Sequence, residues 1–276
     1  MPALPLELER EIFELAVISD RRNAMLKLNL SLVARRVAIW VDFVFYESVT
    51  ISHSRSVDKF LTLIQSKPTG FFTRIVKALC LVCSVGASPA FDILSHCTTV
   101  QRLACFVDLH HQSQSVPSLP LLIGRLPLRR LSIESDHFLC LTATTSTWSE
   151  NLTHIYLVFW GPLSPSDTSR LAQSINRLPR LTHLALDFVD SPIRPLVEAV
   201  HSATLQVLLV SSSNYDEGDY SFDDARIVAC DPPIGDITLP DSRIHWEEKM
   251  WSYGESIIAL RKVSATQTAS EQPGAK

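Results

Sequence analysis

The sequence predicts an α/β chain made of an N-terminal helical unit, a curved solenoid with a parallel sheet, and a C-terminal capping helix. An amphipathic segment begins at Leu4, and an apolar pattern recurs through the middle of the chain at intervals of 24 to 29 residues. With 276 residues, 46% of them hydrophobic, the chain can bury a sizeable core. We expect residues 1–50 to form the helical unit, 51–263 the repeat region and 264–276 a disordered tail.

The first helix is expected to begin near Pro5, because proline suits a first helical turn in which its missing N–H would have no partner. Leu8, Ile12 and Leu15 then fall at i, i+4 and i+7, and Phe13 widens this apolar stripe. A helical unit of about 45 residues has little core of its own. We therefore expect part of the stripe to need a partner.

The repeat has the form apolar-x-x-apolar-x-apolar, which is typical of a short strand with alternate side chains on one face. Its copies start at Val76, Val100, Leu128, Leu152, Leu181 and Leu205. The fourth and sixth positions, such as Leu79 and Leu81, are expected in the core. A strand, a connection and a parallel strand, repeated in this way, predict a solenoid.

The connecting segments carry helix signals of different strength. Expected helices are one capped by Ser56 that stops before Pro68, runs opening at Ser164-Pro165 and Ser191-Pro192, weaker segments at 88–99 and 119–126, and an ambiguous Thr-rich segment at 139–150.

The end of the chain differs in composition from the repeats. Acidic residues at 216–224 are expected to form a solvated loop, and Ile227–Cys230 a last strand. A helix starting at Asp241 carries the large apolar residues Met250 and Trp251. Because a solenoid needs its terminal apolar edge covered, we expect this helix to cap that edge.

The N-terminal residues resemble an F-box. The resemblance lies in Leu4-Pro5-x-Glu7-Leu8 with Ile12-Phe13, continues in Leu30–Arg35, and ends with Trp40 and Phe45-Tyr46. Ala34 stands where that family usually has Cys, and Trp40 lies further from Arg35 than in the commonest form. The arrangement is similar to the degenerate F-box proteins that are numerous in mushroom-forming fungi.

This resemblance implies docking onto the Skp-type adaptor of a cullin-based, SCF-type ubiquitin ligase. The residues expected to bind the adaptor are Leu4, Pro5, Leu8, Ile12, Phe13, Leu32, Val33 and Trp40.

The repeat region resembles irregular leucine-rich repeats, since its period falls in the 20–29 residue range of that family. It lacks the family's Asn ladder. A compact α/β domain whose strands merely share a Leu-rich pattern is the alternative.

Side chains at the third position of each repeat should point away from the core and stack about 4.8 Å apart. Mixed Arg and aromatic character is typical of binding hot spots, and a cationic bias suits an acidic or phosphorylated segment. The residues expected to bind an unknown target protein are Arg102, Phe106, Arg130, His154, Tyr156 and His183. An ordinary solvated sheet face is the alternative.

Other function classes have little support in the sequence. A net charge of −4 argues against nucleic-acid binding, and no apolar run approaches a membrane span. Six cysteines without a secretory signal favour reduced thiols and a cytoplasmic or nuclear location. We expect Cys80 and Cys83 to be core residues, His110-His111 to be incidental, and no metal or cofactor to be bound.

No nucleotide fingerprint or catalytic motif occurs, so we expect a non-enzymatic adaptor that captures a target through its repeats. Two alternatives are a leucine-rich-repeat interaction module without ligase association, and an enzyme with its site on the strand face.

Overall fold

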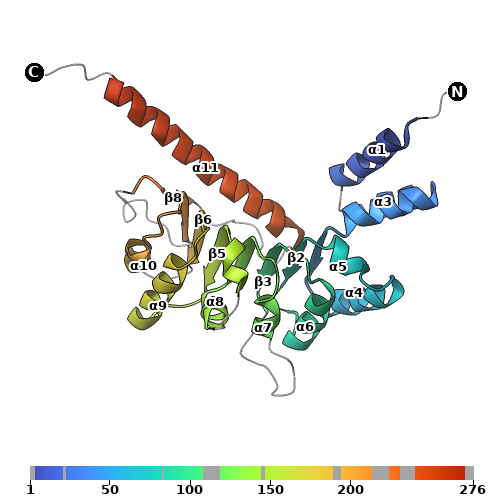
Figure 1. The fold of residues 1–276 in the computed structure, drawn as a ribbon, viewed down its shortest axis with the longest axis horizontal. Coiled ribbons are helices and arrows are strands. Elements are labelled where there is room, and N and C mark those ends of the chain that lie inside the picture. Colours follow the sequence, from blue (N-terminus) through green and yellow to red (C-terminus); the bar gives the residue numbers. More distant parts are fainter. Residues whose placement is uncertain are drawn as a thin grey trace, which may run out of the picture.

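The computed structural model describes residues 4–20, 23–82, 84–107, 119–143, 147–188, 194–212, 224–230 and 240–270. They form an α/β structure around one parallel sheet whose strand order follows the chain order (Figure 1), which confirms the predicted class. The strands are β1 (Ser48–Ile51), β2 (Ala78–Leu81), β3 (Arg102–Cys105), β4 (Arg130–Glu134), β5 (His154–Phe159), β6 (His183–Phe188), β7 (Val207–Ser212) and β8 (Ile227–Cys230).

Helices precede the sheet, connect its strands and follow it. They are α1 (Leu6–Ser19), α2 (Ala24–Ser31), α3 (Arg35–Phe45), α4 (Ser54–Ser66), α5 (Phe71–Ile75), α6 (Ala87–His96), α7 (Leu119–Ile123), α8 (Ser135–Thr142), the 3₁₀ helix η1 (Thr147–Asn151), α9 (Pro165–Asn176), α10 (Arg194–Ala199) and α11 (Pro240–Ser270).

The register of the sheet agrees with the repeat pattern. The third positions pair directly across successive strands: Ala78, Arg102, Arg130, His154, His183 and Val207. The expected last strand is present as β8. The sequence pattern missed β1, which pairs with β2 and takes the last residues of the expected helical unit.

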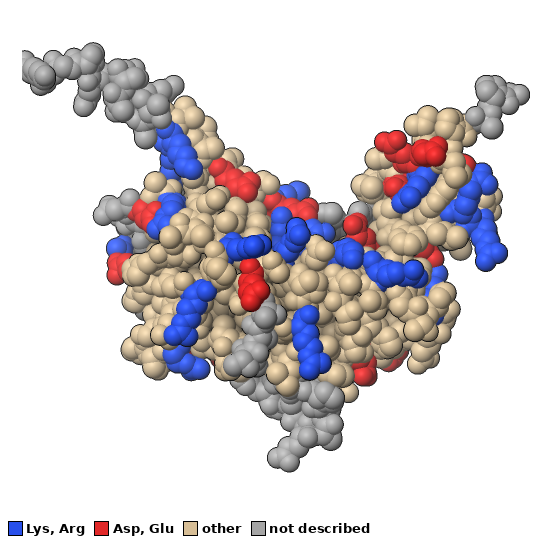
Figure 2. Space-filling model, viewed as in Figure 1, with Lys and Arg blue, Asp and Glu red and all other residues tan. Residues whose placement is uncertain are grey.

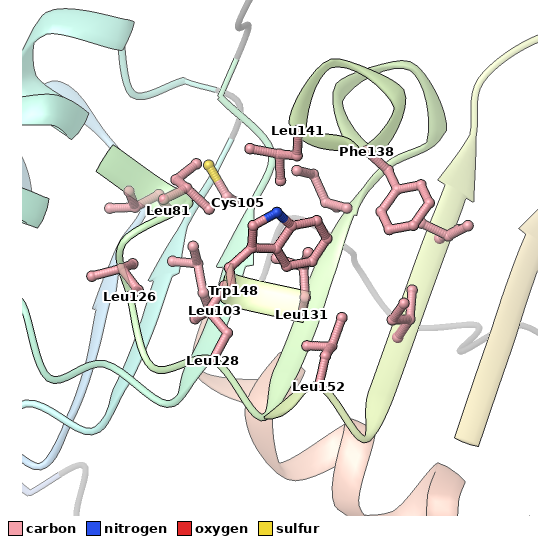
Figure 3. Packing of buried hydrophobic residues seen from close by; sticks show 14 of the residues in the cluster. Leu81, Leu103, Cys105, Leu126, Leu128, Leu131, Phe138, Leu141, Trp148 and Leu152 are labelled. Carbon is pink, nitrogen blue, oxygen red and sulfur yellow. The ribbon is translucent and has the colours of Figure 1, made fainter. Parts of the chain in front are cut away.

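One core lies between the sheet and helices α4 to α10, on the side that these helices cover in Figure 1. Leu79 and Leu81 are fully buried there, as are most of the equivalent residues of later repeats, so the predicted core positions are confirmed. Figure 3 shows Trp148 of η1 among the leucines of neighbouring strands. Its ring meets that of Phe138 edge-on, with centroids 6.1 Å apart, which explains why η1 stays close to the sheet.

Most connecting helices lie close to the predicted segments. Ser164 caps α9 by accepting a hydrogen bond from the Asp167 N–H at 3.1 Å, as predicted. The segment at 139–150 resolves into parts of α8 and η1, and α5 was not predicted. Residues 191–193, 216–223 and 271–276 lie outside the described residues.

Helix α11 does not cap the end of the solenoid, contrary to the prediction. It crosses the sheet face opposite α4 to α10 (Figure 1), where Met250, Trp251 and Ile258 form a second core with the strands. A parallel sheet has two apolar faces to cover, and one connecting helix per strand covers only one of them. The helix also continues to Ser270, through residues 264–270 that were expected to be disordered.

Gly254 marks the closest approach of α11 to the sheet. A Cβ atom at this position would lie 2.6 Å from Leu209 Cδ2 and 3.0 Å from Val207 Cγ1. A side chain at position 254 would have to displace Leu209 and Val207, so glycine favours the close approach of α11 to β7.

We predict that Gly254→Val lowers the free energy of unfolding by about 1–3 kcal/mol, because the branched side chain overpacks this contact. Urea denaturation followed by circular dichroism measures the change. Ser252→Val, at an exposed position of the same helix, is the control and should have a much smaller effect. Equal stability of Gly254→Val and the unaltered chain would contradict the close packing.

Candidate functional site

The N-terminal unit consists of α1, α2 and α3, and its own core is small. The buried residues of this unit are Val17, Val37 and Val41, with Phe13 and Trp40 among the partly buried side chains around them. Asn23 caps α2 by accepting a hydrogen bond from the Leu26 N–H at 2.8 Å. The three helices are thus joined by very few fully buried side chains.

Most of the large apolar side chains that the described chain exposes belong to this unit. They are Leu4, Leu6, Leu8, Ile12, Leu15, Ile18, Met25, Leu28, Leu32, Val33, Ile39 and Phe43, here called the N-terminal apolar surface. Ile12 is 55% exposed and Leu32 76%. Apolar patches of this kind are typical of protein-interaction sites. In Figure 2 the unit is the lobe at the upper right, where uncharged surface lies beside acidic and basic groups.

The residues predicted to bind an adaptor fall into two groups. Leu4, Pro5, Leu8, Ile12, Leu32 and Val33 are exposed. Phe13 and Trp40 instead pack partly against the small core, so their first role is to hold the helices together. The sequence pattern missed Met25, Leu28, Ile39 and Phe43, although helical spacing puts each pair on one face of α2 or α3.

A polar cluster joins this unit to the first repeat. Asp42 of α3 accepts from Lys27 at 3.2 Å and from Lys67, which follows α4, at 2.5 Å. Lys27 also donates to the Tyr46 hydroxyl at 2.7 Å and lies over that ring. These ion pairs connect α2, α3 and the residue after α4. They help to hold α3 in its orientation relative to the sheet.

The residues predicted to bind a target lie beneath α11. Phe106 and Tyr156 are buried in the second core, and His183 is buried against Trp251. Arg102, Arg130 and His154 are half-buried. The sheet face that the repeat pattern presents is therefore occupied by the chain's own C-terminal helix. Sequence reasoning missed this contact because α11 follows the repeats at a distance in the chain.

Acidic residues of α11 pair with the predicted ladder. Glu248 forms an ion pair with Arg102, and buried Glu247 accepts a hydrogen bond from the Ser132 hydroxyl. Glu255 lies 3.1 Å from His183 Nε2. Arg261, further along the helix, donates to the carbonyl oxygen of Ile227 at 2.6 Å. These contacts run along α11 and fix its position across the sheet.

Two stacked imidazoles lie at the centre of this interface. The rings of His154 and His183 are parallel, with centroids 4.1 Å apart, and Trp251 meets both edge-on. Burial, and then the neighbouring His183 and Arg130, lower the pKa of His154 to about 3. Burial also lowers the pKa of His183, although Glu255 acts in the opposite direction. Both rings are accordingly neutral near pH 7.

An open pocket of about 270 Å³ remains beside this covered face, where β2, β3 and β4 begin. Its lining residues are Glu47, Lys77, Gln101, Arg102, Arg129 and Arg130. Lys77, Gln101 and Arg129 each immediately precede a strand. The sequence pattern stopped at the strands and missed them, although the repeat spacing itself predicts that they are neighbours.

Potential metal ligands and cysteines are scattered through the described part of the chain. No group of three or more potential metal ligands occurs among the described residues. Cys80 is fully buried in the second core, while Cys83 and His110-His111 lie outside the described residues. Burial raises the pKa of the Cys97 and Cys105 thiols to about 12. These two thiols are therefore poor nucleophiles.

Comparison with known proteins gives no relative from which a function could be transferred: no family model, curated protein or solved structure matches the chain. Among the described residues, no helix combines the length and apolar character needed to cross a bilayer.

We predict that stability falls as the pH is lowered from about 6.5 towards 3, the window in which an unfolded histidine binds a proton and folded His154 does not. His154→Gln should make the loss of stability with falling pH less steep. Because one proton is involved, the slope of the free energy of unfolding against pH should change by at most about 1.4 kcal/mol per pH unit. Urea unfolding at several pH values measures it, with His96→Gln on the exposed end of α6 as control. An unchanged slope in His154→Gln would contradict the burial of a neutral imidazole.

Proposed function

We propose that this chain is the substrate-recognition adaptor of a cullin-based, SCF-type ubiquitin ligase. The N-terminal unit docks on the Skp-type adaptor subunit as an F-box, and the region that resembles leucine-rich repeats captures a target protein. The observation that supports this best is the N-terminal apolar surface, which stays exposed on a helical unit whose sequence resembles an F-box.

The energetics favour a partner for this surface. Burying one Leu, Ile or Phe side chain stabilises a complex by about 1.5–3 kcal/mol. A few such anchors can supply much of the roughly 8–12 kcal/mol of a micromolar to nanomolar interface. The unit's own core, around Val17, Val37 and Val41, leaves side chains such as Ile12 and Leu32 exposed as candidate anchors.

The departures from the F-box pattern lie on the internal side of the unit. Ala34 and Trp40 are both partly buried against its small core. A smaller residue at position 34 therefore alters packing between helices more than it alters the exposed surface. This placement is compatible with docking through α1 and through Leu32 and Val33.

In this function the chain performs no chemistry. Holding a target near the ligase raises the effective concentration of a target lysine at the conjugating enzyme. Such a role requires a fixed geometry between the docking surface and the target site. The Asp42 cluster, which ties α3 to α2 and to the end of α4, supports that requirement.

We predict that Ile12→Asp and Leu32→Asp each abolish co-purification with a co-expressed Skp-type adaptor, because each buries a charge in the interface. Both side chains are more than half exposed, so the isolated chain should still fold. Leu260→Asp changes an equally exposed leucine on α11 and is the matched control. Size-exclusion chromatography of the co-expressed proteins gives the result.

Adaptor binding that survives both N-terminal variants would contradict this docking surface. No complex with the unaltered chain would favour the alternative, an interaction module that binds targets without a ligase.

A further inference from the structure

The basic pocket at the start of β2, β3 and β4 is the part of the predicted target site that α11 leaves open. Arg102 and Arg130 belong to the predicted ladder, and both line this pocket. The aromatic members of the ladder, Phe106 and Tyr156, are buried beneath α11. Any recognition through the ladder therefore has to take place at this end of the strands.

The pocket carries excess positive charge. Lys77, Arg102, Arg129 and Arg130 line it, and Glu47 is its one carboxylate. Arg102 is paired with Glu248 of α11. The carboxylates of Glu248 and Glu47 offset two of the four positive charges, so two net positive charges remain. In Figure 2, Lys and Arg side chains lie in a row across the middle of the molecule, from the lower end of α11 towards the N-terminal lobe.

The guanidinium groups of Arg129 and Arg130 have no carboxylate partner among the described residues. Lys77 donates to the neutral Thr99 hydroxyl at 3.0 Å, so its charge is not neutralised there. Arg129 is exposed and Arg130 half-buried, so they offer donors to a ligand that reaches the pocket from solvent. The charge of Arg130 also helps to lower the pKa of both His154 and His183.

We propose that this pocket binds a phosphorylated serine or threonine side chain of a target protein, with Arg129 and Arg130 as its main contacts. A phosphoserine carries a charge of about −1.5 to −2 at pH 7, which matches the excess positive charge of the pocket. Two adjacent guanidinium groups also supply the forked donors that phosphate oxygens favour.

The size and setting of the pocket favour a protein-borne group over other anions. Its volume, about 270 Å³, is below the roughly 300–1,000 Å³ typical of small-molecule sites. The pocket therefore suits a phosphate group whose parent molecule stays outside it. A nucleic acid would need an extended basic stripe, and this chain has a net charge of −4.

The experiment uses the full chain and an immobilised degenerate phosphoserine and phosphothreonine peptide library, with the unphosphorylated library beside it. We expect retention on the phosphorylated library to exceed that on the other by about tenfold or more, and inorganic phosphate to compete. The double variant R129Q/R130Q should lose this preference, and Lys77→Gln should weaken it.

Arg55→Gln is the matched control, because Arg55 is exposed in the first turn of α4, at the opposite end of the strands. Circular dichroism confirms folding of each variant, and Arg129→Gln alone, at an exposed position, replaces the double variant if that one does not fold. Equal retention on both libraries would overturn the proposal, as would a preference that R129Q/R130Q retains. Stronger capture by single-stranded RNA, or by vesicles containing phosphatidylinositol phosphate, would also overturn it.

The proposal rests on the proposed function only for the role of the captured protein. Adaptor co-purification, measured with the same variants, separates the two ideas. Phosphopeptide binding without adaptor binding would leave the pocket as the site of a stand-alone interaction module. Adaptor binding without phosphopeptide binding would remove the pocket and keep the docking unit.

Discussion

Both faces of a parallel sheet have to be covered, and this constraint decides which surfaces of the molecule stay open. Helices α4 to α10 cover one face. Helix α11 covers the other with Met250, Trp251 and Ile258, and Gly254 permits its close approach to β7. The strand residues beneath α11 form a second core in which the side chains are as buried as those of the first. A partner can therefore reach the repeats at the ends of the strands more readily than across the sheet.

The same reasoning explains why the N-terminal unit stands out. Its helices bury very few side chains fully, and among the described residues there is no counterpart of α11 to cover the rest. Apolar surface that a chain leaves uncovered on a well-formed helical unit is costly in water unless a partner removes it. The sheet is packed on both faces, whereas the helical unit leaves many apolar side chains exposed. This contrast is the physical basis for proposing that the N-terminal unit is the docking surface.

The repeat pattern predicted the parts of the fold that depend on local periodicity. Leu79 and Leu81, with their equivalents in later repeats, marked the core, and the third positions gave the correct register from Ala78 to Val207. The pattern could not show that His183 is buried, because that depends on Trp251 and Glu255, some seventy residues later. A contact between distant segments leaves no trace in the spacing of either one. The exposure of Ile12 was predictable for a related reason, since the unit's own sequence offers too few residues to cover it.

The two proposed surfaces are connected through a short part of the chain. Helix α3 ends at Phe45, Tyr46 contributes to the Asp42 cluster, and Glu47 already lines the basic pocket. Tyr46 of the Asp42 cluster therefore directly precedes Glu47 in the wall of the proposed target site. A captured phosphorylated segment would lie close to the junction between the sheet and the docking unit. The distance between target and ligase would then be set by the ion pairs of Asp42 and by a few residues of backbone, with no flexible linker between them.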